Sequence, residues 1–258
     1  MPTDDTCPMT SARHPFLDWD GPLPFAHRGG ASDVPENTME AFEYAIDLGY
    51  RYLETDVQVT ADGVLAAFHD NDLKRTCGIA RKISEMTWSE VSTALVDGKA
   101  HIPLLEDLLG AWPVARINID CKSNAAIDAL IASLRRTNSL PRVCVAAFSD
   151  SRLRKLRKEL GSELCSSLGP GELALVRFGL SRHPAGLAAQ VPVRQWPLTV
   201  VNRAFVERSH RLGLQVHVWT IDAAPEMERL LDLGVDGLMT DRPLVLRQVI
   251  KSRGSWHS

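Results

Sequence analysis

The stretch LPFAHRGGASDVPENTMEAFEYAIDLGYRYLETDVQVTADGVLAAFHD, residues 23–70, contains the pattern from which the fold can be predicted. Two short runs with strand character, at 23–29 and 52–58, lie on either side of a segment with helical apolar spacing. Thr38 is suited to cap the beginning of that helix, and Gly49 is suited to end it. The order of strand, helix and strand predicts a βα unit of a parallel sheet.

The same alternation continues through the rest of the chain. Further strands are predicted at 115–122, 142–149, 163–169, 187–201, 214–220 and 236–241, of which 187–201 has the weakest pattern. Further helices are predicted at 103–111, 124–137, 150–160, 202–212 and 223–233. Eight strands with interleaved helices predict an α/β fold, a (β/α)8 TIM barrel. An open doubly wound sheet is the alternative, but no GxGxxG follows the first strand.

The chain of 258 residues has the length of one such barrel. We expect an N-terminal extension at 1–22, a single barrel domain at 23–250 and a short tail at 251–258. The polar segment 71–102 interrupts the alternation, and we interpret it as a small insertion at the barrel mouth.

Composition limits the possible partners and the compartment. With 24% charged residues and a net charge of −3, the chain offers no basic surface suited to nucleic acid. Its five cysteines are odd in number and contain no CxxC pair, which indicates neither a disulfide framework nor a zinc site. No signal peptide is apparent, and no apolar run approaches the roughly 18 residues that cross a bilayer. We therefore expect a cytoplasmic protein without a transmembrane segment.

Carboxylates gather at the predicted strand ends. Glu54 and Asp56 lie two residues apart on one strand, so strand alternation places both side chains on one face. Asp120 ends the next predicted barrel strand. Such acids repel one another unless positive charge lies between them, and one divalent cation, Mg²⁺ or Ca²⁺, would suit an all-oxygen site. In the alternative, the acids pair with Arg28 and Lys122 and bind no metal.

Two histidines are predicted to meet at this mouth. Asp62-Gly63 is a strong signal for a two-residue hairpin turn, which would put His69 opposite Asp56. A four-residue loop would shift the partner but keep His69 on the same face. His27 ends the first strand. One imidazole can accept a proton while the other donates one near neutral pH. Together with acids and cations, this pair describes metal-assisted cleavage of a phosphodiester.

Several motifs occur in the order in which one known family has them. The segments AHRGG, PENTMEAFEYAIDLGYRYLETDVQVTADGVLAAFHD, INIDCK, VHVWTID and GVDGLMTDRP resemble the glycerophosphodiester phosphodiesterase family over residues 23–247. The resemblance implies a TIM barrel that hydrolyses glycerophosphodiesters to glycerol 3-phosphate and an alcohol. It also implies that the 2-hydroxyl of the substrate glycerol attacks phosphorus, and that water opens the resulting cyclic phosphate.

The resemblance also assigns roles to individual residues. It implies that His27 and His69 are the general acid and base, that Glu54, Asp56 and Asp120 hold the metal, that Arg28 and Lys122 contact phosphate, and that Trp219 lines the substrate pocket. The family usually has Glu at the position of Asp120, which leaves the metal preference open.

Two other functions fit the same motifs. A barrel with these histidines could act as a lysophospholipase D or on phosphatidylglycerol, so the small-molecule substrate is either a glycerophosphodiester or a lysolipid. A non-catalytic phosphate binder would have lost a histidine or a metal-binding acid, and this sequence retains all of them.

Overall fold

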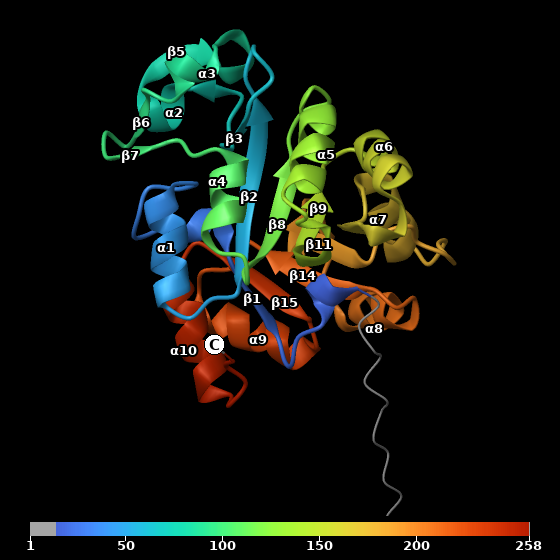
Figure 1. Cartoon of the computed structure of the whole chain (residues 1–258). Helices are drawn as coiled ribbons and strands as arrows, with labels where there is room; N and C mark the ends of the chain where they lie inside the picture. The colour runs from blue at the N-terminus through green and yellow to red at the C-terminus, as the bar shows by residue number, and fades with distance from the viewer. Residues whose placement is uncertain (1–13, 258) are drawn as a thin grey trace, which may run out of the picture.

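Eight parallel strands form the centre of the molecule, and helices surround them (Figure 1). The computed structural model describes residues 14–257. Around the barrel the strands follow the order β1, β2, β8, β9, β10, β11, β14 and β15, and β15 pairs again with β1. A bridge between Ser167 and Ala188 joins β10 to β11 and completes the ring. The barrel strands are β1 (Leu23–Ala26), β2 (Tyr52–Val59), β8 (Arg116–Cys121), β9 (Val143–Ala146), β10 (Cys165–Ser166), β11 (Ala188–Pro192), β14 (Gln215–Trp219) and β15 (Gly237–Thr240).

The architecture is the predicted (β/α)8 barrel, and each predicted strand contributes to it. Two helices that the sequence analysis did not predict, α7 and α10, complete the outer layer. The helices of this layer are α1 (Met39–Asp47), α4 (Leu105–Ala111), α5 (Ala126–Arg136), α6 (Asp150–Leu160), α7 (Pro170–Arg177), α8 (Arg203–Arg211), α9 (Ala224–Leu233) and α10 (Pro243–Ser252).

The first helix begins and ends where its sequence predicts. The Thr38 side chain accepts a hydrogen bond from the backbone N–H of Ala41 at 3.2 Å, which satisfies one free donor of the first turn. After the last turn, Gly49 has φ 88°, a left-handed conformation that glycine adopts without steric cost. These two residues fix the length of α1 and therefore the position of the loop that precedes it.

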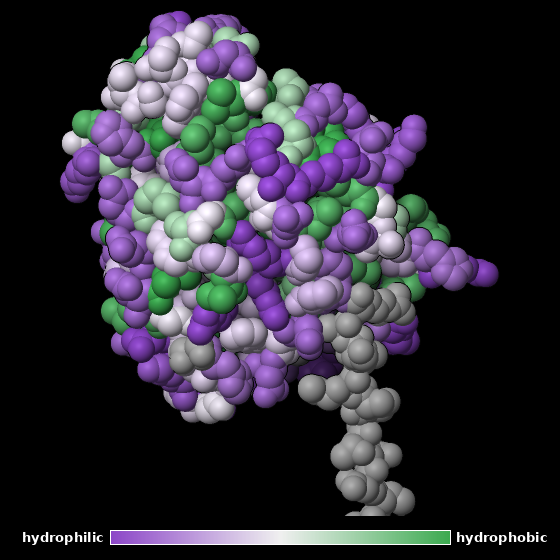
Figure 2. Space-filling model, in the orientation of Figure 1, coloured by the Kyte–Doolittle hydropathy of each residue, from purple (hydrophilic) through white to green (hydrophobic). Residues whose placement is uncertain are grey.

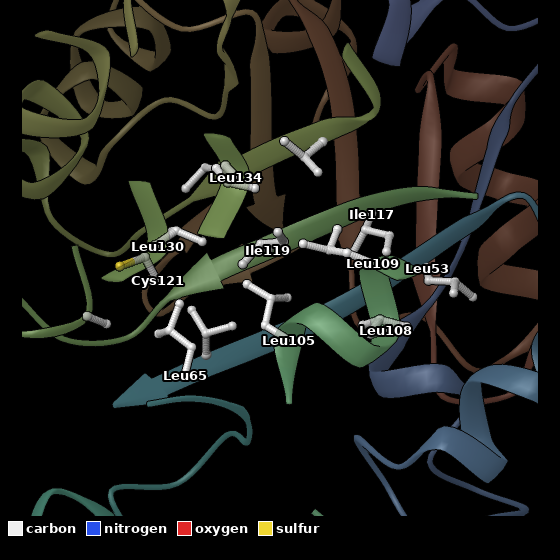
Figure 3. Close-up of a cluster of buried hydrophobic side chains, with 14 of the residues drawn as sticks. Leu53, Leu65, Leu105, Leu108, Leu109, Ile117, Ile119, Cys121, Leu130 and Leu134 are labelled. Atoms are coloured by element: carbon white, nitrogen blue, oxygen red, sulfur yellow. The ribbon is translucent and has the colours of Figure 1, made fainter. Parts of the chain in front are cut away.

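The side chains of β2 and β8 alternate between the helices and the barrel interior. Leu53, Ile117, Ile119 and Cys121 are fully buried in a core cluster with leucines of α4 and α5, which Figure 3 shows. Because alternate residues of a strand point to opposite faces, the residues between them face the barrel interior. Glu54 lies among these inward-facing positions and is 4% exposed, as the sequence predicts.

The bottom of the barrel is filled with aromatic side chains. A short 3-10 helix, Pro15–Leu17, places the fully buried Phe16 against Phe25 and Tyr52. Residues 15–17 lie in the predicted N-terminal extension, whose first 13 residues are outside the described part of the chain. The division of the chain into an extension at 1–22, a barrel domain at 23–250 and a tail at 251–258 stays a prediction.

A polar layer lies above the aromatic residues, with His217 at its centre. His217 is fully buried, and its Nε2 lies 3.1 Å from Gln215 Oε1. The amide of Gln190 lies 3.3 Å from His217 Nδ1 and donates to Asn118 Oδ1 at 2.8 Å. Burial lowers the pKa of His217 to about 4, so the ring is neutral at physiological pH.

This buried histidine predicts an acid-sensitive component of stability. The unfolded chain binds the proton near pH 6.5 and the folded chain only near pH 4, so the contribution is present above pH 6.5 and lost as the pH falls toward 4. The difference between the two pKa values corresponds to a decrease in the free energy of unfolding on the order of 3 kcal/mol between pH 6.5 and pH 4. We expect His217→Gln to lose less stability than the wild type between pH 7 and pH 4 in urea unfolding. Parallel loss in both proteins would contradict this account.

The hairpin that follows β2 has a different register from the predicted one. β2 pairs with the short antiparallel strand β3 (Leu65–Ala67), with Val57 opposite Ala67. Asp56 is therefore adjacent to Phe68, whose N–H donates to the Asp56 carbonyl at 2.9 Å. The predicted pairing of Asp56 with His69 is wrong by one residue.

Side-chain hydrogen bonds in the turn explain the shift. The Thr60 hydroxyl donates to Asp62 Oδ1 at 2.6 Å and accepts from the backbone N–H of Val64 at 3.0 Å. Gly63 has φ 83°. These contacts close a three-residue loop that ends on a left-handed glycine, a common alternative to the two-residue turn.

The segment 71–102 lies beyond the end of β2, on the mouth side of the barrel (Figure 1). It has a small core of its own that includes Leu73, Ile83 and Val91, and it is anchored to the hairpin through Phe68. Its elements are β4 (Asp72–Leu73), α2 (Lys74–Cys77), β5 (Ile79–Lys82), a 3-10 turn (Ile83–Glu85), α3 (Trp88–Val91), β6 (Leu95–Val96) and β7 (Ala100–His101).

The outer surface has no single character on the face shown in Figure 2, where hydrophilic and hydrophobic residues are interspersed. Within residues 14–257, no helix combines the length and the apolar character needed to cross a membrane. One further hairpin, β12 (Arg194–Gln195) with β13 (Leu198–Thr199), follows β11.

Candidate active site

The chain turns sharply after β1 and brings Arg28 back toward β2. Arg28 has φ 52°, a left-handed conformation that is uncommon for a residue with a side chain and often occurs at functional sites. Its backbone N–H donates to Glu54 Oε2 at 3.1 Å. Its carbonyl accepts from the N–H of Asn37 at 2.9 Å, and the Asn37 side chain donates to Asp56 Oδ2 at 3.2 Å. Asn37 thus braces this loop against β2.

Close packing holds the same loop against two helices. A Cβ on Gly29 would lie 2.7 Å from the backbone of Ala41 in α1, and a Cβ on Gly30 would lie 2.7 Å from the ring of Pro243 at the beginning of α10. Only glycine fits at these two positions, so the loop after β1 has a single well-packed path.

His27 is positioned by a carboxylate from the last barrel strand. Because Ala26 is in register with Thr240, the next residues, His27 and Asp241, are neighbours, and His27 Nδ1 lies 2.6 Å from Asp241 Oδ1. His27 Nε2 lies 3.7 Å from Glu54 Oε2. Burial lowers the pKa of His27, but the carboxylates of Glu54 and Asp241 outweigh burial and leave it raised.

His69 has the same kind of partner. Its Nδ1 lies 2.5 Å from Asp70 Oδ1, which leaves Nε2 as the nitrogen without this carboxylate partner. The carbonyl of His69 accepts from Gln58 Nε2 at 3.2 Å, and this bond ties the segment to β2. β3 has already ended at Ala67, so strand alternation no longer determines the direction of this side chain.

The acids of β2 and β8 form a buried group around Lys122. Asp56 and Asp120 are in register on adjacent parallel strands. Lys122 Nζ lies 2.8 Å from Asp56 Oδ1 and 2.7 Å from Asp120 Oδ2. Arg28 Nε lies 3.4 Å from Asp56 Oδ2. These are the ion pairs that the metal-free alternative predicts.

The positive charges of Lys122 and Arg28 do not stabilise the three carboxylates equally. Burial raises the pKa of Glu54 to about 7, and the charge of Asp56 adds to the shift. Burial also raises the pKa of Asp120, whose Oδ1 is buried without a hydrogen-bond partner. For Asp56, burial raises the pKa but Lys122 and Arg28 outweigh it, and the pKa is lowered. Two of the three acids therefore lack sufficient positive charge.

A divalent cation would supply that charge, and the donor set of hard oxygens fits Mg²⁺ or Ca²⁺. The unpartnered Oδ1 of Asp120 and the raised pKa of Glu54 support this fit. In the present arrangement, however, Lys122 lies between Asp56 and Asp120. Among residues 14–257, no cluster of three or more histidine, cysteine, aspartate and glutamate side chains is already arranged to hold a metal ion.

A cavity of about 150 Å³ at the barrel mouth contains the predicted residues. All eight predicted site residues line it: His27, Arg28, Glu54, Asp56, His69, Asp120, Lys122 and Trp219. A second cavity of about 50 Å³ shares the Phe148 and Trp219 side chains with the first. These two rings meet edge to face, with centroids 5.7 Å apart.

Several further residues belong to this site and were not predicted from the sequence. Asn118, Phe148 and Gln190 also line the main cavity. The carboxylates beside the two histidines, Asp70 and Asp241, were not predicted to have a role. Their positions in the sequence could have indicated a role, because each follows a polar residue at the end of a strand or hairpin, where the site residues of a barrel gather.

Known proteins with similar sequences and structures share the family and the fold. Residues 27–245 match the model of the glycerophosphoryl diester phosphodiesterase family. The chain is 39% identical, over 93% of its length and 95% of the relative, to the probable glycerophosphodiester phosphodiesterase 2 of Mycobacterium tuberculosis. It is 28% identical, over 87% of its length and 85% of the relative, to the human lysophospholipase D GDPD1.

Solved structures show the same barrel. The crystal structure of a putative glycerophosphoryl diester phosphodiesterase from Silicibacter pomeroyi superposes with a TM-score of 0.81 at 24% identity, covering 95% of this chain and 99% of that one. The family match covers most of the barrel, from His27 after β1 to the first turn of α10. The chain therefore belongs to the glycerophosphoryl diester phosphodiesterase family, and it is a hydrolase of phosphodiesters.

Proposed function

We propose that this enzyme hydrolyses glycerophosphodiesters to glycerol 3-phosphate and an alcohol by histidine acid–base catalysis that depends on one divalent cation. The observation that carries the proposal is the convergence of His27 and His69 on one cavity, each with Nδ1 on a carboxylate. In both rings this leaves Nε2 for proton transfer.

The chain's residues account for each proton in such a reaction. Arg28 and Lys122 supply positive charge beside the phosphate. One imidazole accepts the proton of the substrate's 2-hydroxyl as its oxygen attacks phosphorus, and the other donates a proton to the leaving alcohol. The P–O bond to the alcohol breaks, and a cyclic phosphate forms. Water then opens the ring with the two imidazoles in exchanged roles, which regenerates the starting protonation states.

Glu54, Asp56 and Asp120 would hold the cation, Mg²⁺ or Ca²⁺. When bound, it supplies positive charge to the phosphate oxygens, which gain negative charge in the transition state. Asp120 also accepts from Lys122, so the same carboxylate would hold a phosphate-contacting ammonium in position. Its side chain is one methylene shorter than the usual Glu of the family.

A second substrate class, the lysophospholipids, is favoured by the smaller cavity. This cavity is lined largely by apolar side chains, among them Phe148, Leu168, Pro170 and Leu173, and it opens beside Trp219. An apolar surface beside the reacting group suits an acyl chain better than a charged head group. The similarity to the human lysophospholipase D supports the same alternative.

The two substrate classes can be separated by one assay. We expect the purified protein to release glycerol 3-phosphate from glycerophosphocholine in an enzyme-coupled measurement. A parallel reaction with lysophosphatidylcholine would measure choline release. Higher kcat/KM for the lysolipid would assign the enzyme to the alternative, and no release from either substrate would contradict the proposed function.

We also infer that the enzyme works in the cytoplasm on small-molecule substrates and without nucleic acid. The cysteines at 77, 121, 144 and 165 are free thiols, which suits a reducing compartment. The remaining cysteine, Cys7, lies outside the described residues.

A further inference from the structure

Arg75, in the insertion at the barrel mouth, contacts carboxylates from two separate parts of the site. Its Nη1 and Nη2 donate to the two oxygens of Glu36 at 2.9 and 2.6 Å. Its Nε donates to Asp70 Oδ2 at 2.6 Å. Glu36 belongs to the loop after β1, whereas Asp70 follows the hairpin of β2. One guanidinium therefore joins two segments that are 34 residues apart in sequence, from position 36 to position 70.

Each of these carboxylates holds a residue of the proposed machinery. Glu36 Oε1 also accepts from Arg28 Nη1 at 3.0 Å. Asp70 uses its other oxygen, Oδ1, for His69 Nδ1 at 2.5 Å. The chain of contacts thus runs from Arg28 through Glu36, Arg75 and Asp70 to His69. It connects a cation that faces the phosphate with an imidazole that transfers a proton.

The contacts use the shape of the guanidinium as well as its charge. A planar fork can make two parallel bonds to one carboxylate and a third bond in another direction, which an ammonium cannot do in the same geometry. The Glu36 side chain is 15% exposed and the Asp70 side chain 23% exposed, so water competes only partly for these bonds.

We propose that Arg75 is a positioning residue, which sets the orientations of Arg28 and His69 relative to each other through Glu36 and Asp70. The inference rests on the proposed histidine chemistry. It gives the insertion a function in the reaction, because Arg75 lies on α2, and α2 belongs to the insertion. Without Arg75, Arg28 and His69 would still line the cavity, but their side chains would no longer be held in a fixed orientation relative to each other.

Three variants test the inference. Arg75→Lys keeps the charge and removes the fork, and Arg75→Ala removes both. Arg81→Ala is the matched control, because Arg81 lies in the same insertion, is also 49% exposed and pairs with Glu90 at 2.8 Å, away from the cavity. The measurements are kcat and KM for glycerophosphocholine, the melting temperature, and activity with added guanidinium chloride at concentrations below those that unfold the protein.

We expect kcat to fall by roughly tenfold to a hundredfold in both Arg75 variants, because misplacement by about 1 Å costs about 10²-fold. Their melting temperatures should stay close to that of the wild type, because partly exposed ion pairs contribute little to stability. Free guanidinium should restore part of the activity of Arg75→Ala, and Arg81→Ala should keep full activity.

A purely structural role would give a different result. It would lower the melting temperature without a matching loss of kcat, and guanidinium would not restore activity. Full kcat in Arg75→Lys, or an equal loss in Arg81→Ala, would overturn the inference. Should Arg75→Ala fail to fold, Arg75→Lys still decides the question. If His27→Ala or His69→Ala kept full activity, the proposed histidine chemistry would be wrong. If both of these variants lost activity while the Arg75 variants kept the kcat of the wild type, only the positioning role of Arg75 would be rejected.

Discussion

Replacing either His27 or His69 by alanine is expected to lower kcat/KM for glycerophosphocholine by roughly 10²–10⁴-fold, the usual contribution of a general acid or base. Both rings line the cavity, and each is oriented by a carboxylate on Nδ1. Removing the ring removes the proposed proton acceptor or donor and leaves Arg28 and Lys122, the cations proposed to contact phosphate, in place. Release of glycerol 3-phosphate under subsaturating substrate measures the effect.

His101→Ala is the control for this prediction, because the exposed His101 side chain lies in β7, away from the cavity, and its Nδ1 lies 2.9 Å from the Ser92 carbonyl oxygen. It should retain wild-type activity. The double variant of His27 and His69 should lose far less than the product of the two single losses, because residues that act as one unit are strongly non-additive. Wild-type kcat/KM in either single variant would remove that histidine from the mechanism.

Removal of divalent cations by EDTA is expected to lower activity by about 10²-fold or more, and Mg²⁺ or Ca²⁺ should restore it. The physical reason is that a bound cation contributes several kcal/mol to stabilising the charge of the transition state, and about 1.4 kcal/mol corresponds to a factor of ten. Glu54→Gln should show the same loss at all practical metal concentrations. Asp128→Asn changes an exposed carboxylate that pairs with Lys155, and it should behave as the wild type.

The metal requirement should also depend on pH. Burial raises the pKa of Glu54 to about 7 in the metal-free protein, and a carboxyl must lose its proton to bind a metal. Below pH 7, the metal concentration that gives half-maximal activity should therefore rise, by up to about tenfold per pH unit for this one proton. Activity that is unchanged after chelation would show that the ion pairs around Lys122 suffice without a metal.

The order of the barrel strands was predictable because each of them has a local signal of its own. Thr38 and Gly49 mark the ends of α1, and they do so in the structure through contacts within a few residues. The register of the hairpin was not predictable in the same way. The register depends on the hydrogen bonds that the Thr60 hydroxyl makes within the turn. The apolar residues after the turn are compatible with both the predicted two-residue loop and the observed three-residue loop, so their pattern does not distinguish the two.

The site shows a similar division. Glu54 and Asp56 could be placed because strand alternation alone decides which face they occupy. The position of Lys122 between two carboxylates depends on the register of β2 with β8, which local sequence does not contain. Arg75 lies in a segment whose sequence has no periodic signal, so its contacts with Asp70 and Glu36 across the mouth could not be predicted.

The bridge between Ser167 and Ala188 has a consequence for the range of substrates. β10 has only two residues and meets β11 at this one bridge, whereas β2, which holds Glu54 and Asp56, has eight residues and pairs on both sides. Local openings concentrate where few hydrogen bonds and buried contacts hold a segment. The wall toward the smaller cavity can therefore widen while the wall with the acids stays fixed. Such a barrel can accommodate substrates of different bulk during evolution without disturbing the residues that we propose to act on phosphorus.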